Sequence, residues 1–185
     1  MKPIQIFMGF ILLSTFGLNA QKIMYGISTG FNVVNRNYSD YDVSSPIISC
    51  NANAYIGYKS QGYWGLSIEP GFIRKGCNFH YAPYRFKIRD SYLQMPILVN
   101  IYFTDKLFLS AGTEIAYYTQ FLGTYDDLLS YRKKLELSGL IGINYNISKK
   151  IDIGLRYNHG ITSISSFSKR YYQYFQILLR IKFKV

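Results

Sequence analysis

The chain has 185 residues, a length that suits one domain, and it combines 19 tyrosines and 13 phenylalanines with a charged fraction of only 17%. A formal net charge of +11 would favour nucleic-acid binding in a soluble protein. Here the basic residues are scattered singly or in pairs, many beside predicted turns. A nucleic-acid partner is therefore not expected.

The N-terminal segment, residues 1–20, predicts a secretory signal peptide. Lys2 supplies a positive charge, an apolar stretch follows, and the small residue Ala20 stands at the cleavage position. An anchoring helix is the alternative, but a polar junction soon follows the apolar stretch. We expect cleavage after Ala20, export from the cytoplasm, and one mature domain at 21–185. Beyond the segment, no run approaches the roughly 20 apolar residues of a membrane helix.

Apolar residues recur at every second position from residue 23 onward, which predicts β-strands and not helices. In the last segment, odd positions are almost all aromatic or aliphatic, while the even positions are largely polar or basic. The same reading along the chain predicts eight strands, at 23–34, 47–58, 63–74, 88–103, 107–120, 134–147, 151–162 and 170–183.

The breaks between these strands alternate in length. Three are tight, at Lys59–Gly62, Thr104–Lys106 and Ser148–Lys150. The others are longer, near 35–46, 75–87, 121–133 and 163–169. An even strand count with short turns at one end and long loops at the other is typical of a bacterial outer-membrane barrel.

The polar positions of the strands distinguish a membrane barrel from a soluble one. A soluble eight-stranded barrel places apolar residues inside, whereas the predicted inward positions here hold Gly, Asn, Ser, Gln, Glu and Arg. We therefore predict an all-β fold, an eight-stranded antiparallel up-and-down transmembrane β-barrel preceded by a signal peptide. Between Tyr92 and Gly112, even residues should face the lumen and odd residues the lipid.

Two prolines fall within predicted strands. Pro70-Gly71 predicts a bulge, because the alternation slips after Phe72. Pro96 cannot donate to a strand ladder, so we expect a bulge or a lumen-side irregularity there.

Several segments resemble the PorT-like outer-membrane beta-barrel family of Gram-negative bacteria. They are "YLQMPILVNIYF" and "LFLSAGTEIAYY" in the centre and "IDIGLRYNHGI" near the end, after a signal peptide ending "NAQ". The resemblance implies an eight-stranded outer-membrane protein. Some relatives belong to a secretion and gliding apparatus, and many have no assigned activity. The family brings no catalytic motif, so no active residue is carried over.

The inward positions predict an ion network in the lumen. Glu69 and Arg156 should meet across the interior, since their strands lie on opposite sides. A structural network that plugs the lumen is the first interpretation, and a gated proton or solute path is the second. The network is expected to comprise Glu69, Glu114, Glu136, Arg156 and Arg180.

Basic residues flank the long loops and predict contact with lipopolysaccharide phosphates at the outer rim. Ordinary solubilising charge is the alternative. The candidates are Arg74, Lys75, Arg85, Lys87, Arg132, Lys133, Lys169 and Arg170.

The two histidines, His80 and His159, are the candidates for catalytic groups. Ser163 and Ser165 follow His159, but a lipid A deacylase would be expected to place serine two residues after its histidine, where Ile161 stands. No catalytic residue, metal or cofactor is therefore expected.

The two cysteines, Cys50 and Cys77, are not expected to pair. Strand register places Cys50 opposite about Gly71, too far from Cys77 for the Cα spacing of a disulfide.

The combined expectation is a non-enzymatic barrel with a plugged lumen. Its outward loops would act in envelope structure, binding or association with a secretion apparatus, with outer-membrane lipids, lipopolysaccharide and envelope or secretion proteins as partners. A narrow porin-like channel is the alternative, and a lipid-modifying enzyme the third.

Overall fold

The computed structural model describes residues 22–38, 43–81, 84–121, 133–165 and 170–184. The predicted signal peptide lies outside these ranges and stays a prediction. Among the described residues, no helix is both long and apolar enough to cross a bilayer.

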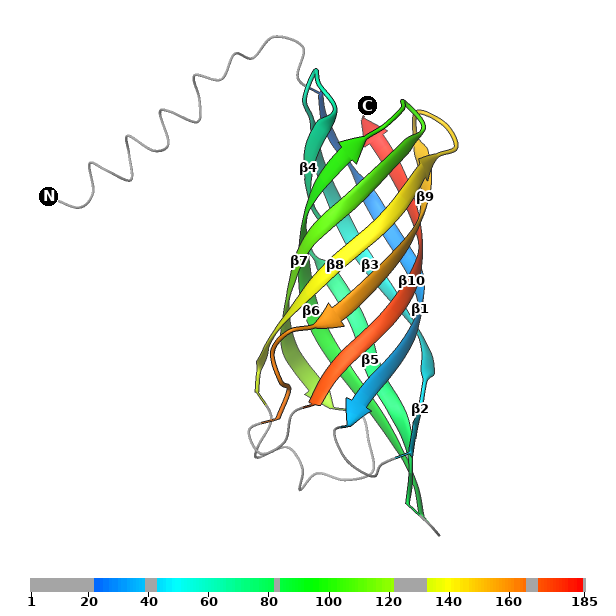
Figure 1. The fold of residues 1–185 in the computed structure, drawn as a ribbon, viewed down its shortest axis with the longest axis vertical. Helices are drawn as coiled ribbons and strands as arrows, with labels where there is room; N and C mark the ends of the chain where they lie inside the picture. Colours follow the sequence, from blue (N-terminus) through cyan, green and yellow to red (C-terminus); the bar gives the residue numbers. More distant parts are fainter. Residues whose placement is uncertain (1–21, 39–42, 82–83, 122–132, 166–169, 185) are drawn as a thin grey trace, which may run out of the picture.

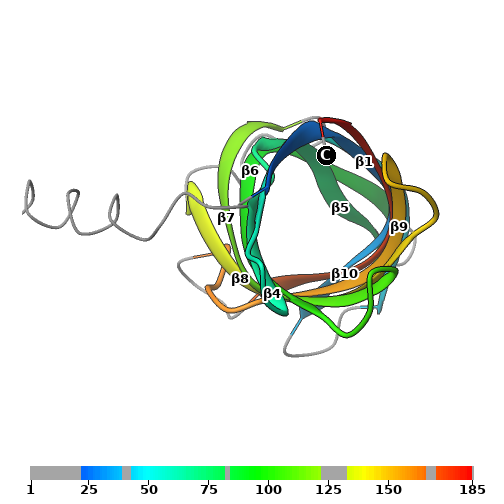
Figure 2. The ribbon, with the colours of Figure 1, turned by 90° about the horizontal axis from the view of Figure 1, so that it is seen from above.

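The described strands form one antiparallel sheet that closes into a barrel (Figures 1 and 2). β1 pairs with β10 on one side and with β3 on the other, so the first and last strands form the closing seam. The strands are β1 (Lys22–Tyr38), β2 (Val43–Ser45), β3 (Ile47–Lys59), β4 (Trp64–Ile68), β5 (Gly71–Tyr81), β6 (Tyr84–Tyr102), β7 (Leu107–Phe121), β8 (Leu135–Asn146), β9 (Ile151–Gly160) and β10 (Arg170–Lys184).

These ten elements build an eight-stranded barrel, because β2 extends β3 along β5, and β4 and β5 form one strand interrupted at Pro70. The predicted bulge at Pro70 is wrong. Ile68 lies opposite Ile97, and Gly71 lies opposite Gln94, so the register against β6 is the same on both sides of the proline. Pro70 only removes a ladder donor, and the inward and outward alternation continues through it.

Pro96 faces the lumen without a bulge. It lies opposite Glu114 in the β6–β7 ladder, whose register is unbroken around it, and its carbonyl accepts a 2.9 Å hydrogen bond from the Glu69 amide. The register shift in this ladder falls instead between Ser91 and Tyr92. The bulge or irregularity predicted at Pro96 is therefore wrong.

The two ends of the barrel differ, as predicted. The tight turns after β3, β6 and β8 gather at one end, called the turn end, which also holds the C-terminal end of β10 (Figure 1). The opposite end is called the loop end. The predicted long break at 75–87 is wrong, since β5 continues to Tyr81 and β6 begins at Tyr84. This hairpin projects beyond the rest of the barrel (Figure 1), where neither face must be apolar and the alternation signal fades.

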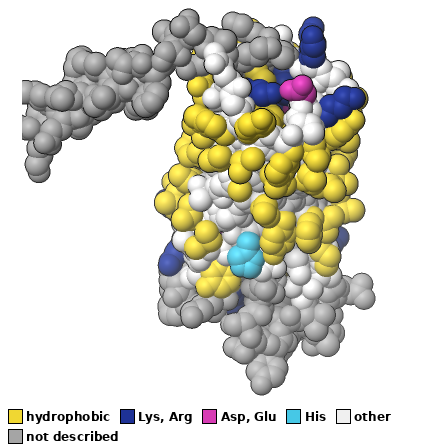
Figure 3. All heavy atoms as spheres, turned by 45° about the horizontal axis from the view of Figure 1, so that its top comes forward, with side chains coloured by type: hydrophobic (Ala, Val, Ile, Leu, Met, Phe, Trp, Pro, Cys, Tyr) yellow, Lys and Arg dark blue, Asp and Glu magenta, His cyan; other side chains and the backbone are white. Residues whose placement is uncertain are grey.

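The sidedness of the wall confirms the predicted barrel. Even residues of β6 and β7 are mostly buried in the interior, whereas odd residues such as Leu93, Val99 and Ile101 are exposed on the outside. Outward-facing apolar side chains form a belt around the wall (Figure 3). A closed barrel satisfies its backbone hydrogen bonds internally, and this wall matches a lipid solvent.

Candidate functional site

The lumen holds most of the acidic side chains of the described chain, together with basic partners. A barrel of eight strands is only wide enough for its own side chains. Among the described residues, five basic and five acidic side chains are buried inside, so their formal charges balance. They are Arg36, Lys75, Arg156, Arg180 and Lys182 with Glu69, Asp90, Glu114, Glu136 and Asp152.

One group of these side chains, the Glu69 cluster, lies toward the turn end and comprises Glu69, Arg156, Arg180, Asp152 and Lys182. Arg156 donates from Nη1 to Glu69 Oε2 at 3.0 Å and from Nη2 to Oε1 at 3.1 Å. Arg180 donates to the same Oε1 at 2.6 Å. Glu69 is fully buried and pairs with two guanidinium groups, of which Arg156 binds in the bidentate geometry that strengthens such pairs.

The Glu69 cluster continues through Arg180 to the turn end. Arg180 donates from Nη1 to Asp152 Oδ1 at 2.8 Å, and Lys182 Nζ lies 2.9 Å from Asp152 Oδ2. The Arg180 guanidinium also lies 4.4 Å from the ring centre of Tyr55. Asp152 and Lys182 were not predicted as members, although they share the inward parity of Arg156 and Arg180 on the same two strands.

A second group, the Lys75 cluster, lies nearer the loop end and comprises Lys75, Glu114, Glu136 and Tyr174. Lys75 Nζ donates to Glu114 Oε1 and to Glu136 Oε1, both at 3.0 Å. Tyr174 donates its hydroxyl to the other Glu114 oxygen at 2.6 Å. Glu114 and Glu136 thus pair with Lys75, and the five residues predicted as one network divide between two clusters.

The placement of Lys75 corrects its predicted role at the outer rim. Its side chain is 0% exposed and faces the lumen, so it is no lipopolysaccharide contact. A bulge at Pro70 would have reversed the parity of the residues after it. Because the strand keeps its register, Lys75 stays on the same face as Glu69.

Apolar side chains fill the lumen at the loop end, beyond the Lys75 cluster. Ile164, from the connection between β9 and β10, is buried there and is held by backbone hydrogen bonds from its amide to the Arg170 carbonyl and from the Lys133 amide to its own carbonyl. Tyr172, next to it, donates to Asp90 across the interior. The apolar cluster is Val34, Ile47, Ile73, Tyr92, Ala116, Ile164, Tyr172 and Tyr174.

Amide and hydroxyl side chains occupy the remaining levels of the lumen. Gln176 donates to both Asn32 and Asn51, at 2.9 and 2.7 Å. Ser110 donates to Asn100 at 2.6 Å and accepts from Asn144 at 2.8 Å. The interior is therefore crossed by side-chain contacts at several heights.

An apolar hollow of about 860 Å³ lies on the outer wall of the barrel, across β1, β10, β9 and β8. Its lining includes exposed, lipid-facing side chains such as Phe31, Leu155 and Phe175. No catalytic chemistry is suggested by this lining.

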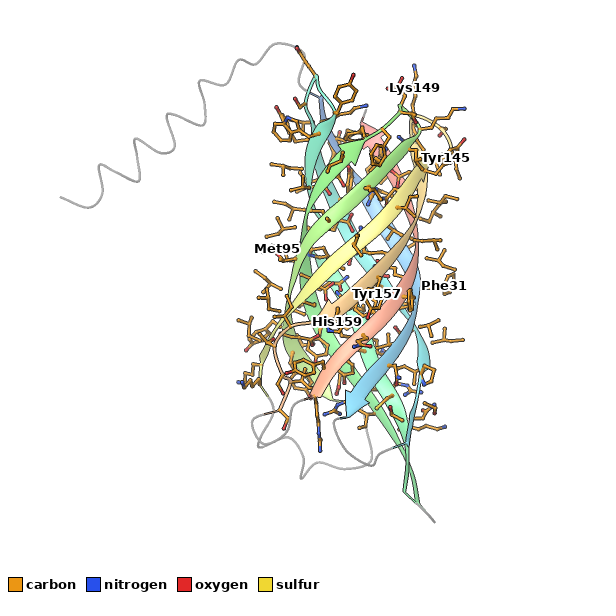
Figure 4. All side chains as sticks on the ribbon, in the orientation of Figure 1. Phe31, Met95, Tyr145, Lys149, Tyr157 and His159 are labelled. Atoms are coloured by element: carbon orange, nitrogen blue, oxygen red, sulfur yellow. The ribbon has the colours of Figure 1, made fainter. Side chains whose placement is uncertain are left out.

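His159 also lies on the outer wall, within the apolar belt (Figures 3 and 4). Its Nδ1 is 3.2 Å from the Tyr157 hydroxyl and 3.1 Å from Gln173 Nε2. Ser163 instead donates to the Ser165 carbonyl. The contacts of the His159 imidazole are therefore Tyr157 and Gln173. The side chain of His80 lies outside the described part of the chain.

The remaining candidates for lipopolysaccharide contact are placed as follows. Arg74, Lys87 and Lys133 are exposed, and Arg170 is partly buried. The side chains of Arg85, Arg132 and Lys169 lie outside the described part of the chain. The exposed three stand on β5, on β6 and just before β8, toward the loop end.

The two cysteines face opposite sides of the wall and are not joined by a disulfide. Cys50 is exposed and Cys77 is buried, which agrees with the prediction that they do not pair. Among the described residues, no group of three or more His, Cys, Asp and Glu side chains is arranged to hold a metal ion.

Comparison with known proteins places the barrel in context. A family model described as "Outer membrane protein beta-barrel domain" matches residues 19–166, well over half of the chain. No curated protein matches the sequence.

Two solved structures share the fold at low identity. One is Ail, the attachment invasion locus protein of Yersinia pestis, in complex with the heparin analogue sucrose octasulfate, with a TM-score of 0.52 and 14% identity over 88% of this chain and 99% of Ail. The other is Neisserial surface protein A, with a TM-score of 0.58 and 12% identity over 86% of this chain and 97% of that protein. At these identities the likeness shows the fold alone.

Proposed function

Because the chain belongs to the outer membrane protein beta-barrel domain family and is an integral barrel of the outer membrane, we propose that it is a non-enzymatic protein with a blocked lumen whose loop end binds lipopolysaccharide. In this membrane the turn end faces the periplasm and the loop end faces outward.

The ion pair between Glu69 and Arg156 is the observation that supports a blocked lumen. It spans the interior, and the Lys75 cluster and the apolar cluster lie beyond it toward the loop end. A solute would have to break buried, hydrogen-bonded ion pairs in order to pass. We expect no stable open steps when the purified protein is inserted in planar bilayers. Reproducible open steps would support the alternative, a narrow porin-like channel.

The proposal of a non-enzymatic role is supported by the contacts of His159. Its neighbours Tyr157 and Gln173 supply neither a serine nucleophile for the imidazole to activate nor an acid to orient the imidazole. Lipid A from cells that express the protein should have the same mass profile as lipid A from cells that lack it. A new lipid A species that disappears when both histidines are replaced would identify a lipid-modifying enzyme.

Contact with lipopolysaccharide is supported by exposed cations at the loop end. Arg74, Lys87 and Lys133 come from different parts of the rim and suit phosphate groups. Ail, of the same fold, was solved with a polyanionic sugar. Replacing these three residues by glutamine should reduce the lipopolysaccharide that copurifies with the barrel, and an unchanged amount would contradict the contact.

A role beside a secretion assembly is a second candidate, suggested by the PorT-like segment "YLQMPIL" on β6. This role is favoured by the β5–β6 hairpin, which projects beyond the rest of the barrel and is therefore accessible to a partner protein (Figure 1). A photocrosslinker at Lys87, on this hairpin, should capture one protein in intact cells. Crosslinks to lipopolysaccharide only would remove this candidate.

A further inference from the structure

The turn end carries lysines on all three of its tight turns. Lys59 ends β3, Lys106 lies between β6 and β7, and Lys149 and Lys150 lie between β8 and β9 (Figure 4 labels Lys149). Figure 3 shows Lys and Arg side chains above the apolar belt at this end. Asp105, the one acidic residue in the turns, lies 3.8 Å from Lys59. No described acidic side chain pairs with the other three lysines.

Backbone and side-chain contacts fix these turns to one another. The Tyr102 amide donates to the Tyr63 carbonyl and the Asn146 amide to the Lys106 carbonyl, both at 2.7 Å. The Lys182 amide donates to the Lys150 carbonyl at 2.7 Å. Lys59 has the inward parity of β3, and its Nζ lies 4.4 Å from the ring centre of Tyr102, a buried lumen side chain. The exposed lysines of the other two turns lie along the rim from β6 to β10 and are called the lysine arc (Lys106, Lys149 and Lys150).

Exposed and partly buried aromatic side chains lie on the outer wall next to the lysine arc. Tyr58 and Trp64 have ring centres 5.8 Å apart, and Tyr25 and Phe183 form an edge-on pair at 6.4 Å. Tyr145 lies in the same collar (Figure 4). Aromatic rings of this kind mark the depth at which acyl chains meet lipid headgroups.

The lysines emerge at the polar edge of this collar. Exposed Phe103 precedes Lys106 by three residues, and exposed Ile147 precedes Lys149 by two. In each of these two turns, the chain thus passes from the apolar belt to an exposed lysine within a few residues. That depth is where the phosphate groups of phospholipids lie.

We propose that the lysine arc is a binding surface for anionic phospholipid headgroups in the periplasmic leaflet of the outer membrane. Its cations are distributed along the rim and are continuous with the lipid-facing belt, so the surrounding lipid fits them better than one acidic protein docked from the periplasm. A lysine near an anionic membrane surface raises local affinity by roughly fivefold. The lysine arc should therefore enrich anionic lipids around the turn end.

Trp64 allows a test confined to this end, because it is the only tryptophan in the chain, lies in the collar, and is 47% exposed. Its fluorescence in vesicles would be quenched by phosphatidylglycerol or phosphatidylcholine with brominated acyl chains. Lipids near the loop end are separated from Trp64 by about 30 Å of hydrocarbon. We expect a severalfold preference for the anionic lipid, measured as a relative binding constant.

Two matched variants test whether the lysine arc causes the preference for the anionic lipid. The triple variant Lys106→Gln, Lys149→Gln and Lys150→Gln should lose the preference, while Lys87→Gln, Lys133→Gln and Lys134→Gln at the loop end should keep it. All six side chains are exposed, and heat-modified gel mobility would show that both variants fold.

Three outcomes would overturn the proposal. Equal quenching by the two lipids in the wild-type barrel would show no enrichment. Persistence of the preference in the turn-end variant would assign it elsewhere. Loss of the preference in inorganic phosphate, but not in sodium chloride of equal ionic strength, would identify a site for free phosphate in place of a lipid headgroup.

Discussion

Arg156 and Glu69 are 87 residues apart in the sequence, and two hydrogen bonds of 3.0 and 3.1 Å join them across the lumen. Their strands, β9 and β4, lie on opposite sides of the closed sheet. The pair therefore links the two halves of the wall through the interior, where water cannot replace a lost partner.

Replacing Arg156 with alanine should destabilise the barrel by about 3–5 kcal/mol, because it leaves excess negative charge buried at Glu69. Arg180 would still contact Glu69, so the lower part of this range is expected. The measurement is the temperature at which the heat-modified gel band changes mobility. Lys87→Ala, at an exposed position, is the matched control. An unchanged transition temperature for Arg156→Ala would contradict the role of the pair.

Replacing Lys75 with methionine should also be strongly destabilising. The change removes the cation that pairs with Glu114 and Glu136, so two buried carboxylates lose their salt bridges to Lys75. The double variant Lys75→Met with Glu136→Gln should recover part of the loss, since it removes one of these charges, and urea titration of folded barrels would measure the coupling. Additive effects of the two changes would argue against their contact.

Ile164→Ala should cost about 2–4 kcal/mol, the usual range for a buried isoleucine that leaves a cavity. Ile164 is 2% exposed within the apolar cluster. Ile161→Ala, three residues earlier and exposed on the outside, is the control and should have a small effect in detergent. Equal urea unfolding midpoints for the two variants would show that packing of Ile164 in the apolar cluster adds no stability.

The two cysteines should differ in reactivity. N-ethylmaleimide should modify Cys50 in the folded barrel in detergent, because its side chain is exposed, and should leave Cys77 unmodified, because it is buried. Both should react after denaturation. Mass spectrometry of proteolytic fragments locates the adduct, and rapid modification of Cys77 in the folded protein would contradict its placement.

Alternation along the chain was sufficient to predict the barrel, the three tight turns and the inward faces of most strands. Period two is imposed physically wherever one face meets lipid and the other meets the lumen. The signal disappears in the β5–β6 hairpin beyond the belt, so a loop was predicted at 75–87, where β5 continues to Tyr81 and β6 begins at Tyr84. The same rule explains why residues within the belt were placed more reliably than those at the rim.

The partners within the lumen were harder to predict than its faces. Parity placed Glu69, Glu114, Glu136, Arg156 and Arg180 on inward positions, and the structure has them there. It could also have found Asp152 and Lys182, which share strands and parity with Arg156 and Arg180. The height of a side chain along the axis of a tilted barrel depends on the register between strands. A single sequence does not supply that register. Lys75 was misplaced because it began the predicted loop at 75–87, whereas β5 continues through it to Tyr81.

The seam between β1 and β10 has a consequence for biogenesis. The strand that closes the cylinder is the last to be made, so a nascent or truncated chain that lacks it would present two unsatisfied edges to hydrocarbon. Completion of the wall thus waits for the C-terminal segment. Until that moment the chain needs a chaperone or an insertase to shield those edges.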